Sequence, residues 1–322
     1  MKIEKNIQNI SITLPILAQK KYLQIKSDKY GWLMNENFIL PYFLDTRLIF
    51  TRMVFTYGLL PLKEGLSIED EQNFLDEMVN FVKKEKLCDF IYKAQSNVIL
   101  NCCPKSSDCV EWGTYEVDLT KNEEELLKSF HGKHRNVIKK AMKDGVEVLP
   151  ITDIKLAQEI IAKTMIRQKV IHYPSLEFLE KLQTNLNDNL LILSSKKENV
   201  IQGVAIIIYD KEKAYYMYGG SVNKPYTGSM NLLHFEAMKI LKEKKVLKYD
   251  FVGARLNFKK GSKYEGLDRF KSRFGGTLIK GYAFRYVVNP IKFKLFNILS
   301  KTYLKLKGYE YVDPIDSIGK IK

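Results

Sequence analysis

The sequence predicts an α/β fold with two subdomains that pack directly on each other. At 322 residues the chain is long for one domain and sufficient for two. Runs rich in β-branched and aromatic residues alternate with helical patterns, and the order of helix, strands, helix and strand recurs in the second half. No Gly/Ser-rich linker separates the halves, so we expect subdomains at residues 1–149 and 150–290 and a tail at 291–322.

Several strands and one helix are expected before residue 118. Strand composition is found in the runs "ENFILPYF", "TRLIFTRMVFTYG", "FIYKAQ" and "WGTYEVDLT". Between them, Ser67 is suited to cap a helix in which Phe74, Met78 and Val82 share one face.

The segment "DLTKNEEELLKSFHGKHRNVIKKAMKDGVEVLP" predicts helical structure followed by a strand. Thr120 and Glu123 have the spacing of a capping box, and Gly145 is a suitable helix stop. Gly132 inside the pattern indicates a kink or two separate helices. "VEVLP" then reads as a strand that ends at Pro150.

The second half begins with a helix capped by Asp153 that runs to about Gln168. The runs "NLLILSS", "VIQGVAIIIYD" and "AYYMYGGS" predict an antiparallel meander. A helix in "SMNLLHFEAMKILKEKK" and a buried strand in "YDFVG" follow, then a basic loop up to Gly276. We expect "TLIKGYAFRYVVNP" to close this sheet.

The charge balance favours anionic partners. Lys and Arg number 52 and Asp and Glu 37, a formal net charge of +15. Nucleic acid, phosphorylated metabolites and an acidic membrane face all fit, and the balance alone does not choose among them. Because the lysines are spread along the whole chain, a surface of merely solvated lysines fits as well.

Cysteine usage and hydropathy indicate a cytoplasmic protein. Four cysteines cluster within 22 residues without a paired C-x-x-C spacing, so we expect free, buried thiols and no zinc: Cys88, Cys102, Cys103 and Cys109. The start of the chain lacks the pattern of a secretory signal, and no apolar run is long enough to span a membrane.

The tail is a basic amphipathic segment, "PIKFKLFNILSKTYLKLKGYEYV". A helix on a membrane surface and a helix docked on the body of its own protein are both compatible with it. We favour docking, with peripheral membrane contact as the alternative.

Four motifs in a fixed order resemble the FemABX family of aminoacyltransferases. The first is the "DLT" strand end with "K-x-R-x-x-I-K-K-A", matched by Asp118, Leu119, Thr120, Lys133, Arg135, Ile138, Lys139, Lys140 and Ala141. The second is the Tyr-rich strand "YYMYGGS" at 215–221. The third and fourth are matched by Tyr249, Asp250, Phe251 and Gly253, and by Phe270, Lys271, Phe274, Gly275 and Gly276.

The resemblance covers about residues 115–285 and implies two tandem domains of the acetyltransferase (GNAT) type. It also implies transfer of an amino acid from aminoacyl-tRNA, as co-substrate without a further cofactor, to a peptidoglycan precursor in cell-wall cross-bridge formation. The first 110 residues depart from the pattern: Lys26, Lys29 and Trp32 are the nearest candidates for the family's early Trp and substrate-binding Lys. The helical-hairpin arm of some members has no counterpart, and we expect a compact monomer.

Acyl transfer to an amine needs a deprotonated amine, a partner for the developing oxyanion and a basic track for a polyanionic donor. We expect Lys271, held by Phe270 and Phe274, to supply the cation; the resemblance implies the same role. Gly275 and Gly276 would bring the backbone close to substrate. Asp250 is either a catalytic group or a turn partner, and substrate-assisted deprotonation without a protein base is also compatible.

Further substrate-binding candidates are Arg167 and Tyr173, which could meet a diphosphate, and Tyr216 and Tyr218, which period-two spacing places on one strand face. Six basic residues in the 128–143 segment could bind tRNA phosphates or form a solvated face: Lys128, Lys133, Arg135, Lys139, Lys140 and Lys143. His131 and His134 lack a third ligand at metal spacing, so no metal is expected.

Two other classes stay open. An acyl-CoA-dependent N-acyltransferase acting on a cell-surface sugar would need a glycine-rich pyrophosphate loop, where this chain has "SVNKPYTGSMNLL". A non-enzymatic protein that binds nucleic acid or membrane would need a concentrated basic face, and the lysines are dispersed.

Overall fold

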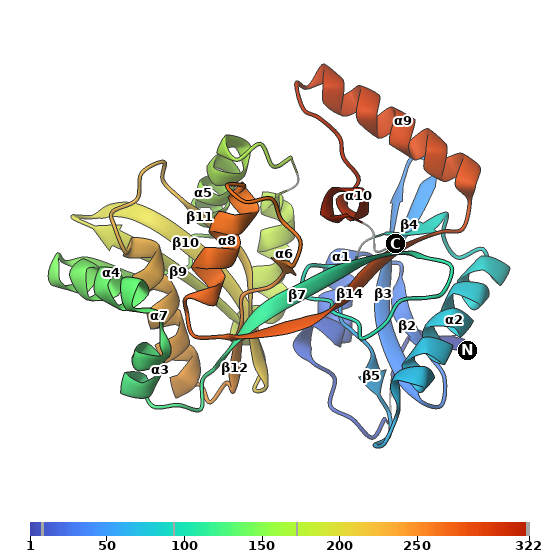
Figure 1. Cartoon of the computed structure of the whole chain (residues 1–322), viewed down its shortest axis with the longest axis horizontal. Helices are drawn as coiled ribbons and strands as arrows, with labels where there is room; N and C mark the ends of the chain where they lie inside the picture. Colours follow the sequence, from blue (N-terminus) through green and yellow to red (C-terminus); the bar gives the residue numbers. More distant parts are fainter. Residues whose placement is uncertain (8–9, 93, 172, 320–322) are drawn as a thin grey trace. The chain divides into compact units, whose positions relative to one another are not determined.

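The computed structural model describes residues 1–322 except 8–9, 93, 172 and 320–322, so the last three residues of the predicted tail lie outside the described residues. The chain forms two compact units (Figure 1). Unit 1 contains 1–114, 253–264 and 280–322, and unit 2 contains 115–252 and 265–279. The predicted α/β class, with a mixed sheet and helices in each subdomain, is confirmed.

The division differs from the predicted boundary after residue 149, which falls inside unit 2. The physical reason is pairing between segments distant in sequence. The end of β7 (Asp108–Asp118) pairs with β12 (Lys248–Asp250), and α4 (Gly132–Lys143) packs on α7 (Ser229–Glu243). The helical segment at residues 123–143, although it precedes residue 150, therefore belongs with the later sheet.

In unit 1 the strand order is β1-β2-β3-β4-β6-β14, with β5 on β3 and β13 on the first part of β7. All these neighbours are antiparallel except β4 and β6, which are parallel. The bounds are β1 Lys2–Glu4, η1 Ile16–Ala18, α1 Lys20–Lys26, β2 Tyr30–Met34, β3 Phe38–Arg47, β4 Phe50–Phe55, β5 Leu60–Pro61, α2 Ile68–Lys84, β6 Phe90–Ile91, β13 Ala254–Arg255, β14 Thr277–Val287, α9 Pro290–Leu306 and α10 Pro314–Ile318.

In unit 2 the strand order is β7-β12-β11-β10-β9-β8. The meander of β9, β10 and β11 is antiparallel as predicted, and β12 joins β11 in parallel. The remaining bounds are α3 Glu123–Ser129, β8 Val146–Pro150, α5 Ile154–Arg167, α6 Leu176–Leu186, η2 Asn187–Asn189, β9 Leu190–Lys197, β10 Val200–Tyr209, β11 Lys213–Ser221 and α8 Lys263–Ser272. The strand β14 pairs with β6 of unit 1, so the expectation that it closes the second-half sheet is wrong.

Local capping signals account for several helix starts. Ser67 forms a capping box with Asp70, and the Asp153 side chain caps α5, both at the predicted positions. The predicted Thr120 box is wrong: Asn122 and Glu125 form it, while the Thr120 hydroxyl donates to Asp118 at 2.7 Å. The helix break predicted near Gly132 is confirmed as two helices, α3 and α4.

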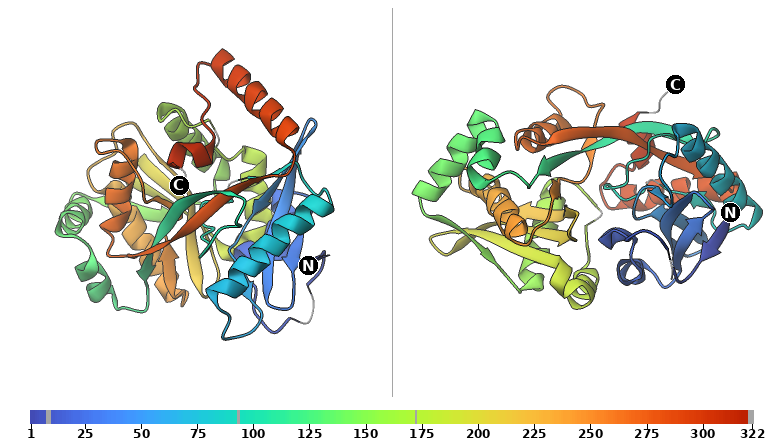
Figure 2. Two further views of the ribbon diagram at one scale, coloured as in Figure 1. Left: turned by 45° about the vertical axis from the view of Figure 1, so that its right-hand side comes forward. Right: turned by 90° about the horizontal axis from the view of Figure 1, so that it is seen from below.

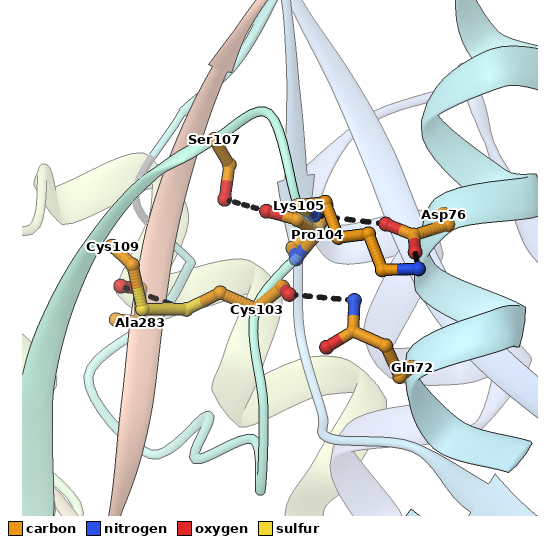
Figure 3. The surroundings of a disulfide bond; sticks show 8 residues. All are labelled: Gln72, Asp76, Cys103, Pro104, Lys105, Ser107, Cys109 and Ala283. Carbon is orange, nitrogen blue, oxygen red and sulfur yellow. Dashed lines mark hydrogen bonds and ion pairs between the residues drawn. A yellow bond between two sulfur atoms is a disulfide. The ribbon is translucent and has the colours of Figure 1, made fainter. Parts of the chain in front are cut away.

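A disulfide joins Cys103 to Cys109 (Figure 3), which corrects the expectation of four free thiols. The run before β7 folds back beside the strand and brings the two Cα atoms to 6.1 Å, within bridging distance. Cys88 is a free, buried thiol as expected, and Cys102 is free and partly buried. Burial raises the pKa of Cys88 to about 12.

The tail packs on unit 1 at both of its helices. Phe296 of α9 lies 5.5 Å from Phe50 and 5.0 Å from Phe90 between ring centroids. Beyond α9 the chain returns to the strands of unit 1 (Figure 1 and the left view of Figure 2). There Ile315 and Ile318 of α10 enter a small core with Val110, Trp112 and Ala283.

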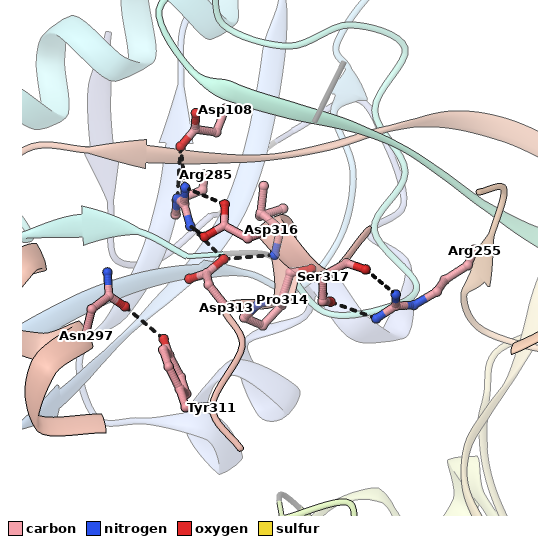
Figure 4. A network of polar contacts seen from close by, with 10 residues as sticks. Asp108, Arg255, Arg285, Asn297, Tyr311, Asp313, Pro314, Asp316 and Ser317 are labelled. Carbon is pink, nitrogen blue, oxygen red and sulfur yellow. Dashed lines mark hydrogen bonds and ion pairs between the residues drawn. The ribbon is translucent and has the colours of Figure 1, made fainter. Parts of the chain in front are cut away.

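A buried ion cluster holds the segment around α10 on unit 1. The Arg285 guanidinium, 4% exposed, pairs with Asp108, with Asp313 at 2.7 Å and with Asp316 at 3.1 Å (Figure 4). Despite burial, these carboxylates raise the pKa of Arg285 above its ordinary value, so the guanidinium is charged. No helix among the described residues is both long and apolar enough to cross a membrane.

Candidate active site

The predicted site residues after Tyr249 gather where β12 ends and α8 packs. The expected loop of residues 249–276 is a helix over Lys263–Ser272, so Lys271 lies in its last turn. Its Nζ donates to the carbonyl of Val252 at 2.8 Å. The prediction of a loop failed because Gly261 and Gly266 interrupt the helical pattern and the segment has no buried stripe of its own.

Val252 forms a strained turn directly after β12. Its φ is 51°, in the left-handed region that is unusual for a β-branched residue. The buried Asp250 stabilises this turn because its Oδ1 accepts a hydrogen bond from the Val252 N–H at 2.7 Å. Of the two roles left open for Asp250, the structure shows the turn partner.

The electrostatics of Lys271 depend on burial and on two carboxylates. Burial lowers the pKa of the Lys271 ammonium to about 8, while Asp250 and Asp268 act in the opposite direction. Asp268 also accepts a hydrogen bond from the Tyr115 hydroxyl at 2.8 Å. Lys271 is thus a cation that can lose its proton near neutral pH, a property typical of functional sites.

Phe270 and Phe274 contact each other rather than enclosing Lys271. Their ring centroids are 5.2 Å apart: Phe270 lies in α8 and Phe274 in the turn directly after it, while the Lys271 ammonium donates to the Val252 carbonyl. Both rings pack on two buried histidines: His134 lies 4.7 Å from Phe274, and His234 lies 5.6 Å from Phe270. The rings therefore anchor α8 to unit 2.

Sequence reasoning missed His234. Its Nδ1 shares a 2.8 Å hydrogen bond with the Tyr249 hydroxyl, and Tyr216 stacks edge-on at 4.5 Å. Burial, with a contribution from the nearby Lys271, lowers the pKa of His234 to about 3. A histidine on the apolar stripe of a helix gives no signal that distinguishes it from ordinary core.

Gly275 and Gly276 serve close backbone packing. Gly275 has a φ of 70°, and a Cβ on it would lie 2.5 Å from the Ser129 carbonyl oxygen. A Cβ on Gly276 would lie 2.9 Å from the Glu116 carbonyl oxygen of β7. The glycines thus let the chain pass the end of α3 and the edge of β7.

Tyr216 and Tyr218 contact different helices, although period two predicts one face. Tyr216 meets His234 of α7, and Tyr218 meets Phe178 of α6 at 6.2 Å. The register shifts between Ile206 and Ile207, which oppose Tyr218 and Tyr216, and this bulge interrupts the alternation. Burial raises the pKa of both tyrosines to about 12.

The other predicted binding residues lie on the surface. Arg167, at the end of α5, is exposed and donates to the Ser221 carbonyl at 3.0 Å, and Tyr173 is also exposed. On α4, Lys133, Lys139 and Lys143 are exposed. Arg135 instead donates to backbone carbonyls of the preceding turn.

In unit 1, the three early candidates differ in exposure: Trp32 is buried, Lys26 is partly buried and Lys29 is exposed. Burial lowers the pKa of Lys26 to about 8, and its Nζ lies 5.6 Å from the centroid of Phe43. The Trp32 indole donates to the Ala18 carbonyl at 2.8 Å. Trp32 also lines a pocket of about 240 Å³ together with Asn6, Ile7, Leu14, Gln19 and Lys20.

The segment before α7 is unsuited to a CoA pyrophosphate. Gly228, the N-cap of α7, has a φ of 86°, and a Cβ on it would lie 2.1 Å from the Val137 carbonyl oxygen. Tyr226 donates its N–H to Gln202 at 2.8 Å and its hydroxyl to Asp144. The turn is therefore packed against α4 and β10. No group of three or more potential metal ligands was found within the described part of the chain.

The chain is an α/β protein that carries the four sequence motifs, and comparison with known families specifies its class. The FemAB family model matches residues 106–196 and 191–301, more than half of the chain. The chain belongs to the FemAB family, which confirms the resemblance seen in the sequence.

The sequence similarity to an individual curated relative is low and covers only part of each chain. The Lipid II:glycine glycyltransferase of Staphylococcus saprophyticus is 27% identical over 132 residues, which are 40% of this chain and 32% of that protein. The match thus spans about a third of the relative's length.

Two solved structures share the fold. FemX gives a TM-score of 0.62 at 16% identity, covering 87% of this chain and 94% of that one. L-PGS from Bacillus licheniformis gives a TM-score of 0.52 at 15% identity, covering 86% of this chain and 90% of that one.

Proposed function

We propose that this chain is an aminoacyltransferase that moves an amino acid from aminoacyl-tRNA to an amine of a peptidoglycan precursor. The observation that carries the proposal is the FemAB family match over residues 106–301, joined by the partial sequence match to a glycyltransferase that acts on lipid II. We place the reaction in the cytoplasm, where charged tRNA is found.

The reaction joins the acceptor nitrogen to the carbonyl carbon of the aminoacyl ester. The C–N bond forms, the bond from the carbonyl carbon to the ribose oxygen breaks, and the proton lost by the amine ends on the ribose hydroxyl. Negative charge develops on the carbonyl oxygen in between, and a fixed cation lowers that barrier. In this proposal Lys271 is that cation, because Val252 fixes its position and its surroundings are partly desolvated.

The remaining candidates have supporting roles. Asp250 holds the turn that binds Lys271, and the Phe270 and Phe274 rings fix the helix that carries it. The exposed lysines of α4 are candidates for contacts with tRNA phosphates, in line with the net charge of +15. Arg167 and Tyr173 stay candidates for the precursor.

A donor screen tests this function. The purified chain is incubated with tRNA pools charged with labelled amino acids, or with acyl-CoAs, and with nucleotide-linked or lipid-linked muropeptide. We expect transfer from charged tRNA, detected as a mass increase of one amino-acid residue on the precursor and abolished by ribonuclease. Acylation from CoA without a tRNA requirement would overturn the proposal in favour of an N-acyltransferase.

A further inference from the structure

Helix α9 has two apolar faces, and only one of them packs on unit 1. Phe293 and Phe296 lie 5.1 Å and 5.0 Å from Phe90 between ring centroids. Lys292 supports this contact through an ion pair with Asp89 at 3.0 Å. These contacts hold the first half of the helix, and Leu304 is buried near its end.

The second apolar face is exposed to solvent. Its members are between 38% and 83% exposed and follow one another at spacings of one, three or four residues: Ile291, Leu295, Ile298, Leu299, Tyr303 and Leu306. This spacing gives one continuous stripe along the helix. A helix that only docks on its own protein carries polar residues on the side away from the core, so docking leaves this stripe unexplained.

A row of lysines lies beside the stripe. Lys294, Lys301 and Lys305 are exposed and spaced seven and four residues apart, which places them along one flank of the apolar stripe. From Pro290 to Gly308 the sequence contains no Asp or Glu. An apolar stripe flanked by lysines, on a helix too polar to span a membrane, is the pattern of helices that lie in a membrane interface.

We propose that the exposed face of α9 binds the surface of an anionic lipid bilayer. The helix lies parallel to the membrane, with Ile298 and Leu299 among the upper acyl chains and the lysine row on lipid phosphates. A second copy of this chain fits the face less well. A self-complementary contact would place two lysine rows in one interface, and α9 offers no carboxylate to neutralise them.

This inference stands without the proposed transferase activity. If both hold, α9 brings the enzyme to the surface where a lipid-linked acceptor would lie. Binding to vesicles and transfer to a soluble, nucleotide-linked precursor are separate measurements, so each proposal can fail without the other.

Co-sedimentation of the full chain with vesicles tests the proposal. We expect binding to vesicles of phosphatidylcholine mixed with phosphatidylglycerol, weak binding to phosphatidylcholine alone, and loss of binding with added salt. The triple variant Lys294→Glu, Lys301→Glu, Lys305→Glu should lower partitioning at least roughly 100-fold, since each lysine near an anionic surface contributes about 1 kcal/mol. Its control, Lys133→Glu, Lys139→Glu, Lys143→Glu on α4, makes the same charge change elsewhere and should bind at least tenfold more tightly than the α9 variant.

A double variant of two apolar residues tests the contribution of the apolar stripe to vesicle binding separately from that of the lysines. Ile298→Glu with Leu299→Glu should abolish binding, while Leu149→Glu with Ile166→Glu, at similarly exposed positions, should retain most of it. Circular dichroism and thermal unfolding check that each variant is folded. The proposal is overturned if the native chain does not bind anionic vesicles, or if α9 variants and controls lose binding equally. A different result would assign the face to a second copy of the chain. In that case the native chain does not bind vesicles but sediments as a dimer, and the double variant Ile298→Glu, Leu299→Glu sediments as a monomer.

Discussion

The Lys271 ammonium donates a 2.8 Å hydrogen bond to the carbonyl of Val252, a residue held at a φ of 51°. A non-glycine residue in this region costs of order 1–3 kcal/mol unless its surroundings hold it. Here Lys271 donates to the carbonyl of Val252 and Asp250 accepts from its N–H, so the peptide groups on both sides of the Val252 Cα are held. The end of β12 and the end of α8 are therefore fixed to each other, which is what a positioned cation requires.

Replacing Lys271 tests the electrostatic role. Lys271→Met keeps an unbranched side chain one atom shorter and removes the charge, so we expect kcat to fall roughly 100- to 1,000-fold, the usual cost of losing one oxyanion partner. Arg269→Met removes an exposed charge from the same helix and should change kcat less than about twofold. Single-turnover transfer with charged tRNA measures both, and equal rates for Lys271→Met and the native chain would discard the role.

The pH dependence of transfer reports the protonation state that acts. The pKa of Lys271 is lowered to about 8, so a reaction that needs the ammonium slows as the pH rises through about 8. In Lys271→Arg the guanidinium keeps its charge, and we expect this decline to disappear even if the absolute rate is lower. Rates are corrected for spontaneous hydrolysis of the ester. A rate that instead rises through pH 8 only when Lys271 is present would assign it as a general base.

Much of the secondary structure could be predicted because its signals are local. Ser67 and Asp153 cap helices through their own turn, and the meander follows from three apolar runs. The same locality explains the error at Thr120. Two overlapping capping boxes are possible in "TKNEEE", and Asn122 forms the one observed.

The errors about the site arise from contacts distant in sequence. The bulge that separates Tyr216 from Tyr218 depends on the register with β10, and the role of Gly275 depends on Ser129. The Cys103–Cys109 bond is different, because it joins residues only six apart and depends on how the chain folds back before β7. The motif residues identified Lys271 and Asp250, but their shared turn at Val252 is visible only in the structure.

A pair of glycines in one segment tests the close packing of the chain. Gly275→Ala places a Cβ 2.5 Å from the Ser129 carbonyl at a φ of 70°, so we expect a loss of about 2 kcal/mol or more in the free energy of unfolding. Gly266→Ala, inside α8 with open space around it, should stabilise the protein by about 0.5–1 kcal/mol. Urea unfolding measures both, and a neutral effect at Gly275 would contradict the close approach of this glycine to the end of α3.

The buried histidines make the stability of unit 2 depend on pH. Burial, with Arg273 and His131 nearby, lowers the pKa of His134 to about 4, and the pKa of His234 is lowered to about 3. Between these values and about 6.5 the unfolded chain binds protons that the folded chain does not, so the free energy of unfolding falls as the pH is lowered through this window. Each such histidine contributes up to about 1.4 kcal/mol per pH unit to this decline in the free energy of unfolding.

His134→Phe isolates one of these contributions, because the new ring can occupy the place between Phe270 and Phe274 without titrating. We expect the decline of the unfolding free energy between pH 6.5 and 4 to become shallower by about one proton in urea titrations at several pH values. If His134→Phe and the native chain share one slope, His134 is protonated in the folded protein and the aromatic packing around it is looser than the structure shows.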